Sequence, residues 1–318
     1  MKRILIMGGN QFVGKEVAKN FCKKENKVYV INRGTHENME EAIHLECDRN
    51  NFDELKRILE NVSVDVIIDI SAYTDVQANL IQAVMKNKFN HYILISSASV
   101  YNNIGQYPVV EEDSIGENSI WGDYAKNKYL AEKITIKNSK NYDFKYTIFR
   151  PFYIYGIGNN LDRENYIFSR IKYDLPIFLP NKGEGIVQFG YIDDLVSAIE
   201  MSTENHMFYD NILNISGDEA ITFNKLIEIA ETVMDKKIIK RYIDTNINDT
   251  KARDWFPFRD VNLFGDISKI KGLGFENKYS IFEGLKKVYT HNEENGLIVK
   301  PKLNETEKTY GIKNSSTQ

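Results

Sequence analysis

The chain has 318 residues, of which 42% are hydrophobic and 27% are charged, as is ordinary for a soluble globular protein. Its formal charge of −4 argues against a general binder of nucleic acid, because such domains carry a surplus of basic residues. The two cysteines predict no disulfide framework, and no apolar run reaches the ~20 residues of a membrane span or forms a signal-peptide core, so we expect a cytoplasmic protein.

The first half of the chain alternates short apolar runs with amphipathic stretches. Apolar and β-branched residues predict strands over residues 4–7, 28–31, 43–47, 64–70, 92–96 and 146–149. Helices are expected between them, over residues 13–24, 75–86 and 124–137. Strands that are apolar throughout and alternate with helices predict an α/β fold with a Rossmann-like, doubly wound parallel sheet. Ligands of such a sheet bind at the carboxyl ends of its strands.

Beyond about residue 156 the alternation is less regular and loop residues are more frequent. We therefore assign residues 1–156 to the Rossmann-like domain, with residues 186–216 returning to it, and residues 157–291 mainly to a smaller C-terminal lobe. Helices are expected from about residue 192, over residues 222–234 with Thr222 as N-cap, and over residues 280–289. Residues 292–318 are polar and predict a mobile tail.

A glycine-rich loop joins the first expected strand to the first expected helix, the context that a dinucleotide fingerprint requires. Glycine allows a tight turn and lets backbone N–H groups approach a pyrophosphate at the helix N-terminus. Gln11 replaces the usual middle glycine, so its side chain must point away or donate a hydrogen bond. A plain strand–helix turn is the alternative interpretation. The expected phosphate-binding residues are Gly8, Gly9, Gln11, Phe12, Val13 and Gly14.

Side chains after the second and third strands bear on which dinucleotide binds. NAD sites place an acid after the second strand to bind ribose hydroxyls, whereas an arginine suits a 2′-phosphate. Asn32 and Arg33 stand there, so the sequence favours NADP as the NAD(P) cofactor. The alternative is a surface arginine in a turn. Asp48, after the third strand, is a candidate for the adenine amino group.

Tyr124 and Lys128 are four residues apart on an expected helix and so share one face. A neighbouring cation lowers a phenol pKa from about 10 towards a value useful for general acid–base catalysis. Tyr129 and Lys133 repeat the spacing but lie roughly 140° around the helix, so both pairs cannot serve one site. Ser97, at the end of the fifth strand, favours the first pair, because its hydroxyl would lie on the cofactor side of the sheet. An ordinary strand end is the alternative for Ser97.

In order and spacing these residues resemble the extended short-chain dehydrogenase/reductases, the NAD-dependent epimerase/dehydratase family. The resemblance covers about residues 1–290 and is carried by residues 8–14, Asp48, 97–101, Tyr124 to Lys128 with 131–132, 150–151 with 155–156, and 191–195. It implies an NAD(P)-binding domain, a substrate lobe, frequent homodimers and a sugar or nucleotide-sugar substrate.

The resemblance also implies roles for single residues. Ser97, Tyr124 and Lys128 fall on the catalytic triad of the family, and Ser71, Ala72, Pro151 and Tyr153 fall at its cofactor. Gln11, Asn32-Arg33 and residues 150–156 resemble a divergent branch that includes the chloroplast stem-loop RNA-binding proteins. Nucleotide-sugar enzymes usually have an asparagine where Tyr153 stands, a departure at the nucleotide-diphosphate contact.

The reaction type follows from two positions after the serine. Family dehydratases typically place Asp or Glu there, whereas this chain has Ala98 and Ser99. The resemblance therefore favours an epimerase or a ketoreductase over a dehydratase, and leaves open whether the hydride returns to the substrate. A non-catalytic RNA-binding protein and a cofactor sensor without turnover are further alternatives, and the intact triad and the negative charge disfavour the first.

Substrate contacts are expected from Ser99 and Tyr153 and from polar residues of the second lobe, where arginines suit phosphate through bidentate donation. For each arginine a surface salt bridge is the alternative. Asp193 and Asp194 are expected to cap a helix, and the five histidines lack zinc-ligand spacing, so no metal is expected. The candidates in the second lobe are Arg163, Tyr166, Gln188 and Arg259.

Overall fold

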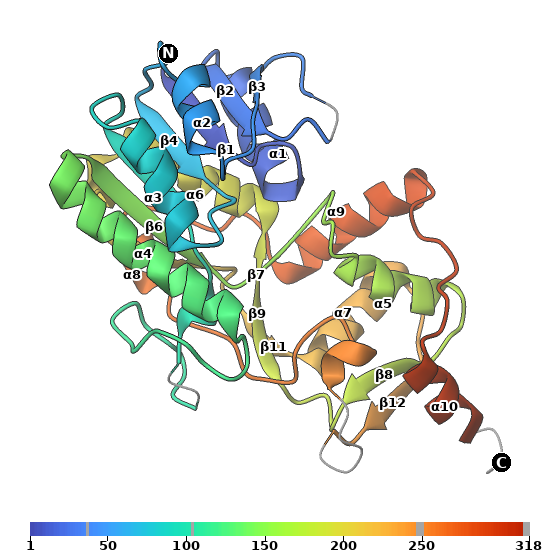
Figure 1. Cartoon of the computed structure of the whole chain (residues 1–318). Helices are drawn as coiled ribbons and strands as arrows, with labels where there is room; N and C mark the ends of the chain where they lie inside the picture. The colour runs from blue at the N-terminus through green and yellow to red at the C-terminus, as the bar shows by residue number, and fades with distance from the viewer. Residues whose placement is uncertain (36–37, 103–104, 246–250, 314–318) are drawn as a thin grey trace. The chain divides into compact units, whose positions relative to one another are not determined.

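The structure, a computed structural model, describes residues 1–35, 38–102, 105–245 and 251–313, without the side chains of 310–313 (Figure 1). By its internal contacts the chain divides into two compact units. Unit 1 comprises Met1–Ile154, Ile192–Ser216 and Gly265–Lys278. Unit 2 comprises Tyr155–Tyr191, Gly217–Phe264 and Tyr279–Gln318. The third segment of unit 1 was not indicated by the sequence.

Unit 1 is built on a seven-stranded sheet of order β10-β6-β5-β4-β1-β2-β3, in which every neighbouring pair is parallel. This confirms the predicted doubly wound parallel sheet, and all strands predicted from the sequence are present. The strands are β1 (Arg3–Met7), β2 (Lys27–Asn32), β3 (Ile43–Glu46), β4 (Val66–Asp69), β5 (His91–Ile95), β6 (Lys145–Pro151) and β10 (Asn211–Ile215).

The register of the sheet brings three strand ends level. Met7 of β1 pairs with Asp69 of β4, and Asp69 pairs with Leu94 of β5. The loops that follow β1, β4 and β5 therefore leave the same carboxyl edge side by side. This edge is where parallel α/β sheets bind their ligands.

Helices flank this sheet, with α1 packed on α6 and α3 packed on α4. Leu5 and Ile67 join a buried cluster with Ala78 of α3 and Ala131 of α4, because alternate strand side chains point to opposite faces. The helices predicted over residues 13–24, 75–86 and 124–137 and from about residue 192 are confirmed as α1, α3, α4 and α6. The helices α2 and α8 were not predicted. The helices of unit 1 are α1 (Phe12–Lys23), α2 (Phe52–Ile58), α3 (Asp75–Val84), α4 (Asp123–Tyr142), α6 (Ile192–Glu204) and α8 (Ser268–Gly272), with 3-10 turns η1 (Ala98–Val100) and η2 (His206–Phe208).

A buried ion pair ties α4 to the sheet. Arg150 of β6 donates to both carboxylate oxygens of Glu132, over 3.0 and 2.7 Å, and both side chains are at most 1% exposed. The remaining nitrogen of Arg150 donates to the Tyr101 hydroxyl and to the Glu111 carbonyl oxygen. Ser96, the residue after β5, also donates to Glu132. These bonds fix the rotation of α4 about its axis relative to the strand ends.

Unit 2 combines short strands with helices. Thr222 caps α7 by accepting from the Lys225 N–H over 3.1 Å, as predicted, and Ser280 caps α9. One sheet pairs β8 (Ile177–Pro180) with β12 (Lys240–Ile243). The other has the order β11-β9-β7, with β11 (Ala220–Thr222), β9 (Ile186–Tyr191) and β7 (Tyr153–Tyr155). The boundary between the two units falls within β7 in the sequence. The helices of unit 2 are α5 (Arg163–Lys172), α7 (Phe223–Met234), α9 (Ile281–Glu294), α10 (Glu305–Lys313) and the turn η3 (Ala252–Asp254).

The end of the described chain differs from the expected mobile tail. Ile298 is buried, and the carboxylate of Glu307 is fully buried against the Arg170 guanidinium. Asn304 and Glu307 also exchange hydrogen bonds at the start of α10. A single buried acid can anchor a segment of polar composition, which composition alone does not reveal. In the part of the chain that the structure describes, none of the helices has the length and apolarity needed to cross a bilayer.

The Arg150–Glu132 pair predicts a large loss of stability when one partner is neutralised. Glu132→Gln leaves the Arg150 charge buried without a counter-charge, which costs about 3–5 kcal/mol of unfolding free energy. Asp65→Asn in the exposed pair between Arg3 and Asp65 is the matched control and should cost less than about 1 kcal/mol. Urea denaturation followed by circular dichroism measures both. Equal small losses would contradict the structural role of the buried pair.

Candidate functional site

The glycine-rich loop between β1 and α1 is closed on itself so tightly that side chains are excluded. A Cβ atom on Gly14 would lie 1.9 Å from the Gly8 carbonyl oxygen, and one on Gly9 would lie 2.7 Å from Val30. Gly8 has a φ of +91°, and a Cβ there would lie 2.8 Å from the Cβ of Ser71. All three glycines are therefore required by geometry, and the loop presents backbone rather than side chains.

The N-terminus of α1 suits an anion. Gln11 is the N-cap, with extended backbone, but its exposed side chain makes no capping hydrogen bond to the helix. No acidic residue lies in the first turn, so nothing acidic offsets the positive end of the helix dipole there. The loop and helix start together fit a dinucleotide pyrophosphate, which is the use to which such termini are put in Rossmann folds.

The end of β2 is shaped by a turn. The Asn32 side-chain oxygen accepts from the Gly34 N–H over 2.7 Å, which orders the turn after the strand. Arg33 is exposed and forms no ion pair with any residue that the structure describes. Glu46 flanks the same turn, since a Cβ on Gly34 would lie 2.6 Å from its carboxyl carbon. Asp48 is exposed and accepts two hydrogen bonds from Asn50, so it orders its own loop.

Lys128 of α4 is buried at the carboxyl edge of the sheet. Its ammonium group donates to the carbonyl oxygens of Ala72, over 2.9 Å, and Ile95, over 2.8 Å, and lies 5.0 Å from the centre of the Tyr73 ring. Burial lowers the pKa of Lys128 from 10.5 to about 8, and the neighbouring Asp69 carboxylate partly opposes this effect. The side chain is therefore charged at neutral pH although it is fully buried.

Tyr124 lies one helical turn before Lys128 and is 40% exposed. Its ring centre is 6.3 Å from that of Tyr73. The competing pair behaves differently, because Lys133 is exposed and extends over the Tyr129 ring at 5.2 Å. Of the two pairs that share the spacing, the structure brings only the Tyr124 pair to the strand ends through Lys128.

Ser97 follows β5 and caps the turn η1. Its hydroxyl oxygen accepts from the Ser99 N–H over 3.1 Å, so its hydrogen is available for another acceptor. Ser99 is 1% exposed, and within the described ranges its hydroxyl has no hydrogen-bond partner. A buried hydroxyl without a partner is costly, and a bound ligand would satisfy it. Pro151 and Tyr153 are also buried, and the centre of the Tyr153 ring lies 6.4 Å from that of Trp121.

The candidates in unit 2 are largely engaged in holding that unit together. Gln188 is buried and donates to the Gly217 carbonyl oxygen over 2.7 Å. The Tyr166 ring packs edge-on against Phe256, and its hydroxyl is 3.5 Å from Glu307. The Arg163 guanidinium lies over the Phe258 ring at 5.4 Å, and Arg259 is half-buried. Across the parts of the chain that the structure describes, no three acidic, histidine or cysteine residues gather as a metal site.

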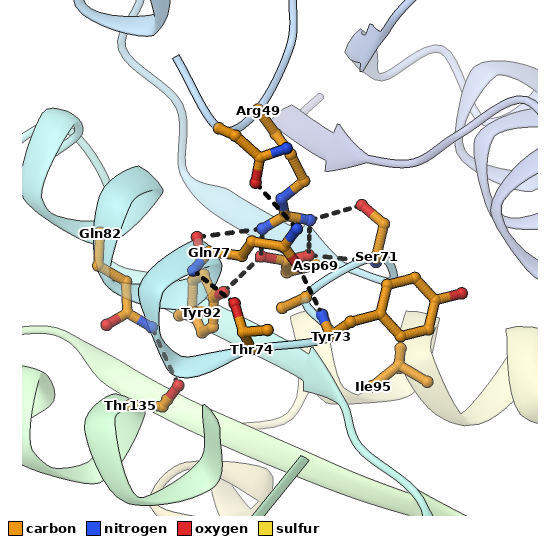
Figure 2. Close-up of polar contacts among 12 residues, drawn as sticks. Arg49, Asp69, Ser71, Tyr73, Thr74, Gln77, Gln82, Tyr92, Ile95 and Thr135 are labelled. Carbon is orange, nitrogen blue, oxygen red and sulfur yellow. Dashed lines mark hydrogen bonds and ion pairs between the residues drawn. The ribbon is translucent and has the colours of Figure 1, made fainter. Parts of the chain in front are cut away.

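Sequence reasoning missed a charged cluster behind the strand ends, which Figure 2 shows. Arg49 donates to both oxygens of Asp69, each over 2.8 Å, and to the Ser71 hydroxyl over 2.5 Å. Tyr92 donates to Asp69 over 2.6 Å. The available signal was an arginine after the third strand and an aspartate ending an otherwise apolar fourth strand. It becomes meaningful only once the strand order is known.

The fold and the loop define a Rossmann-type protein with a dinucleotide-binding fingerprint. A family model, the NAD dependent epimerase/dehydratase family, matches residues 4–216. The chain belongs to this family.

Two relatives indicate the range of the family. The chain is 30% identical over 308 residues to the chloroplast stem-loop binding protein of 41 kDa b from Arabidopsis thaliana, covering 91% of this chain and 78% of that one. It is 28% identical over 275 residues to a UDP-glucuronate 4-epimerase from Thermodesulfobacterium geofontis, covering 80% of each.

Solved structures of the same fold include the UDP-glucose 4-epimerase of Thermotoga maritima, with a TM-score of 0.78, 18% identity, and coverage of 92% of this chain and 99% of that one. A dTDP-glucose 4,6-dehydratase from Bacillus anthracis in complex with NAD has a TM-score of 0.79, 18% identity, and coverage of 95% and 99%. At these identities the likeness shows the fold.

The geometry of the glycine loop predicts the effect of one methyl group. Gly14→Ala forces the loop away from the Gly8 carbonyl and should weaken NADH binding at least about tenfold, or 1.4 kcal/mol. Gly272→Ala is the matched control, since nothing lies within 4 Å of a Cβ there. Fluorescence titration with NADH measures both. Equal affinities of the two variants would contradict the assignment of this loop to the cofactor.

Proposed function

We propose that the chain is an NAD(P)-dependent epimerase or ketoreductase acting on one carbinol carbon of a sugar or nucleotide sugar. The observation that carries the proposal is the position of Lys128, a lysine buried without a carboxylate partner among the described residues. Lysine is almost never fully buried unless it is paired, so its place at the ligand-binding edge needs a functional reason. The names of the relatives support the substrate class.

The proposed roles follow from the side chains. When bound, the nicotinamide ring accepts or supplies the hydride. Lys128 places a positive charge one turn from Tyr124, and such a charge favours the phenolate form of a tyrosine. Tyr124 then exchanges the proton with the substrate oxygen at the reacting carbon. Ser97 donates to the same oxygen, since its own oxygen is occupied as an acceptor of the Ser99 N–H.

One observation weighs on the reaction type. Elimination of water needs an additional acid, and Ala98 and Ser99 supply no carboxylate at the positions after Ser97. The proposal therefore favours epimerisation or net reduction over dehydration. The Ser99 hydroxyl and Tyr153 are proposed to contact the substrate, with Arg163, Tyr166, Gln188 and Arg259 as the candidates in unit 2.

The cofactor preference is a prediction of its own. Because Arg33 is exposed beside the end of β2, we expect NADPH to bind more tightly than NADH, and Arg33→Ala to remove the difference. Mass spectrometry of the cofactor retained on purification, followed by titration with both nucleotides, measures this. Tightly held NAD⁺ would indicate chemistry that returns the hydride, whereas exchangeable NADPH would indicate net reduction. Stronger binding of NADH by the unaltered chain would make the NADP preference wrong.

The proton-transfer role of Tyr124 predicts a specific loss. With a substrate found on a nucleotide-sugar panel, Tyr124→Phe should lower kcat by about 10²–10⁴-fold, the usual contribution of a general acid or base. Tyr129→Phe is the matched control, because it removes the same hydroxyl from the competing pair on the same helix. Full activity of Tyr124→Phe would refute the assigned role.

RNA binding is a second candidate function, favoured by the 30% identity to a stem-loop binding protein. The net charge of −4 weighs against it, since phosphate contacts require basic residues. Salt-dependent retention of a stem-loop RNA, compared with binding of NADH and NADPH, separates the two functions. Strong retention of RNA without binding of either nucleotide would overturn the enzymatic proposal.

A further inference from the structure

A buried polar cluster stands directly behind the end of β4 (Figure 2). The Asp69 carboxylate is fully buried and accepts from Arg49 through two N–H groups, from the Tyr92 hydroxyl and from the Ser71 backbone N–H. Arg49 is 12% exposed and donates further to the Ser71 hydroxyl and to the Gln77 carbonyl oxygen. The cluster thus joins the loop after β3 to the end of β4, to Tyr92 near the start of β5 and to the start of α3.

Stability alone is a weak explanation for this cluster. Removing two charges from water costs several kcal/mol for each ion, and buried pairs can often be replaced by apolar residues without loss of stability. The Arg49 Nε group adds to this cost, since it is buried without an acceptor in the described parts of the chain. What the pair does provide is direction, because a bidentate guanidinium–carboxylate contact fixes both groups.

The first group that the cluster directs is the Ser71 hydroxyl. A Cβ on Gly8 would lie 2.9 Å from this oxygen, so the hydroxyl lies at the turn that opens the phosphate loop. A hydroxyl has one hydrogen and two lone pairs. Because the oxygen accepts from Arg49 over 2.5 Å, the hydrogen is directed to another acceptor. Ser71 is therefore presented as a donor at the loop.

The second group is Lys128, which is held by Ala72, the residue after Ser71. The Ala72 carbonyl oxygen accepts from its ammonium group over 2.9 Å. The charged groups that act on Lys128 are Asp69 and Glu132, which raise its pKa, and Arg49, which lowers it, while the Tyr73 ring lies beside it. One ion pair thus bears on the position and on the protonation of Lys128.

We propose that Arg49 is a positioning residue: through Asp69 it holds the end of β4 so that Ser71 donates a hydrogen bond to a nicotinamide dinucleotide at the Gly8 turn and Ala72 holds Lys128. This inference rests on the proposed function insofar as the ligand is a dinucleotide. Arg49 itself contacts neither cofactor nor substrate. Its contribution passes through Ser71 and Ala72.

Binding of NADH and NADPH to the full chain, followed by fluorescence, tests whether Arg49 acts on dinucleotide binding through the Ser71 hydroxyl. The double variant Arg49→Met with Asp69→Asn removes both charges, so neither is left buried alone, and Ser71→Ala removes the donor. Each should weaken binding at least about tenfold. When all three substitutions are combined, binding should be no weaker than in the more affected of the two variants, because both variants remove the same hydrogen bond to the dinucleotide. Arg57→Met, at an exposed arginine of α2, is the matched control.

The titration of Lys128 gives a readout that a merely structural role would not move in this way. It is followed by NMR of the chain labelled with ¹³C at lysine Cε, with the signal assigned from Lys128→Arg. Asp69→Asn should lower the pKa of Lys128 from about 8 and Arg49→Met should raise it, because each removes one charge that acts on the ammonium group. In the double variant these two charge effects oppose each other, and loss of the Ala72 contact exposes the ammonium group to water, so the pKa of Lys128 should rise above the wild-type value.

The outcomes separate this inference from the proposed function. If the wild-type chain binds neither NADH nor NADPH, both the proposed function and the role of Ser71 as a donor to the dinucleotide are wrong. Wild-type affinity in both the double variant and Ser71→Ala overturns the positioning role while leaving the proposed function intact. A wild-type Lys128 pKa in the double variant overturns the link to Lys128. Should the single variants fail to fold, the double variant and Ser71→Ala still decide the first question.

Discussion

The hydrogen bonds from the Lys128 ammonium group to Ala72 and Ile95 join α4 to the loop after β4 and to the end of β5, and the candidate site depends on these contacts. They set which face of α4 looks at the strand ends and hence where Tyr124 lies. The level register of β1, β4 and β5 brings the glycine loop to the same edge. A charge that would be unfavourable elsewhere in the interior is held by two backbone carbonyl groups, at the edge where parallel α/β sheets bind their ligands.

Two buried arginine–carboxylate pairs support this edge from different sides. Arg150 and Glu132 fix α4 against β5 and β6, whereas Arg49 and Asp69 fix the end of β4. Both pairs lie behind the residues that would contact a ligand. The arrangement is typical of sites whose geometry must be held within a fraction of an ångström, because second-layer contacts determine the rotamers of the first layer.

Much of the fold could be predicted from the sequence, because apolar strands and amphipathic helices leave a local pattern. The glycine loop and the Tyr124–Lys128 spacing are local as well. The cluster of Arg49, Asp69 and Tyr92 could not be predicted, since its members come from three separate strand regions and meet only when the strand order is known. The burial of Glu307 could not be predicted either, because its partner Arg170 is far away in the sequence and the polar segment around Glu307 has the composition of a mobile tail.

The division of the chain has a consequence for how the protein is made. Unit 1 is completed by β10 and by residues 265–278, so its sheet cannot gain its last strand until the ribosome has released most of the chain. During synthesis at about 5–20 residues per second, β6 waits several seconds with one edge open. An unpaired strand edge is a template for wrong pairing. The edge of β6 that β10 later covers is thus open to wrong pairing until residues 211–215 have been made.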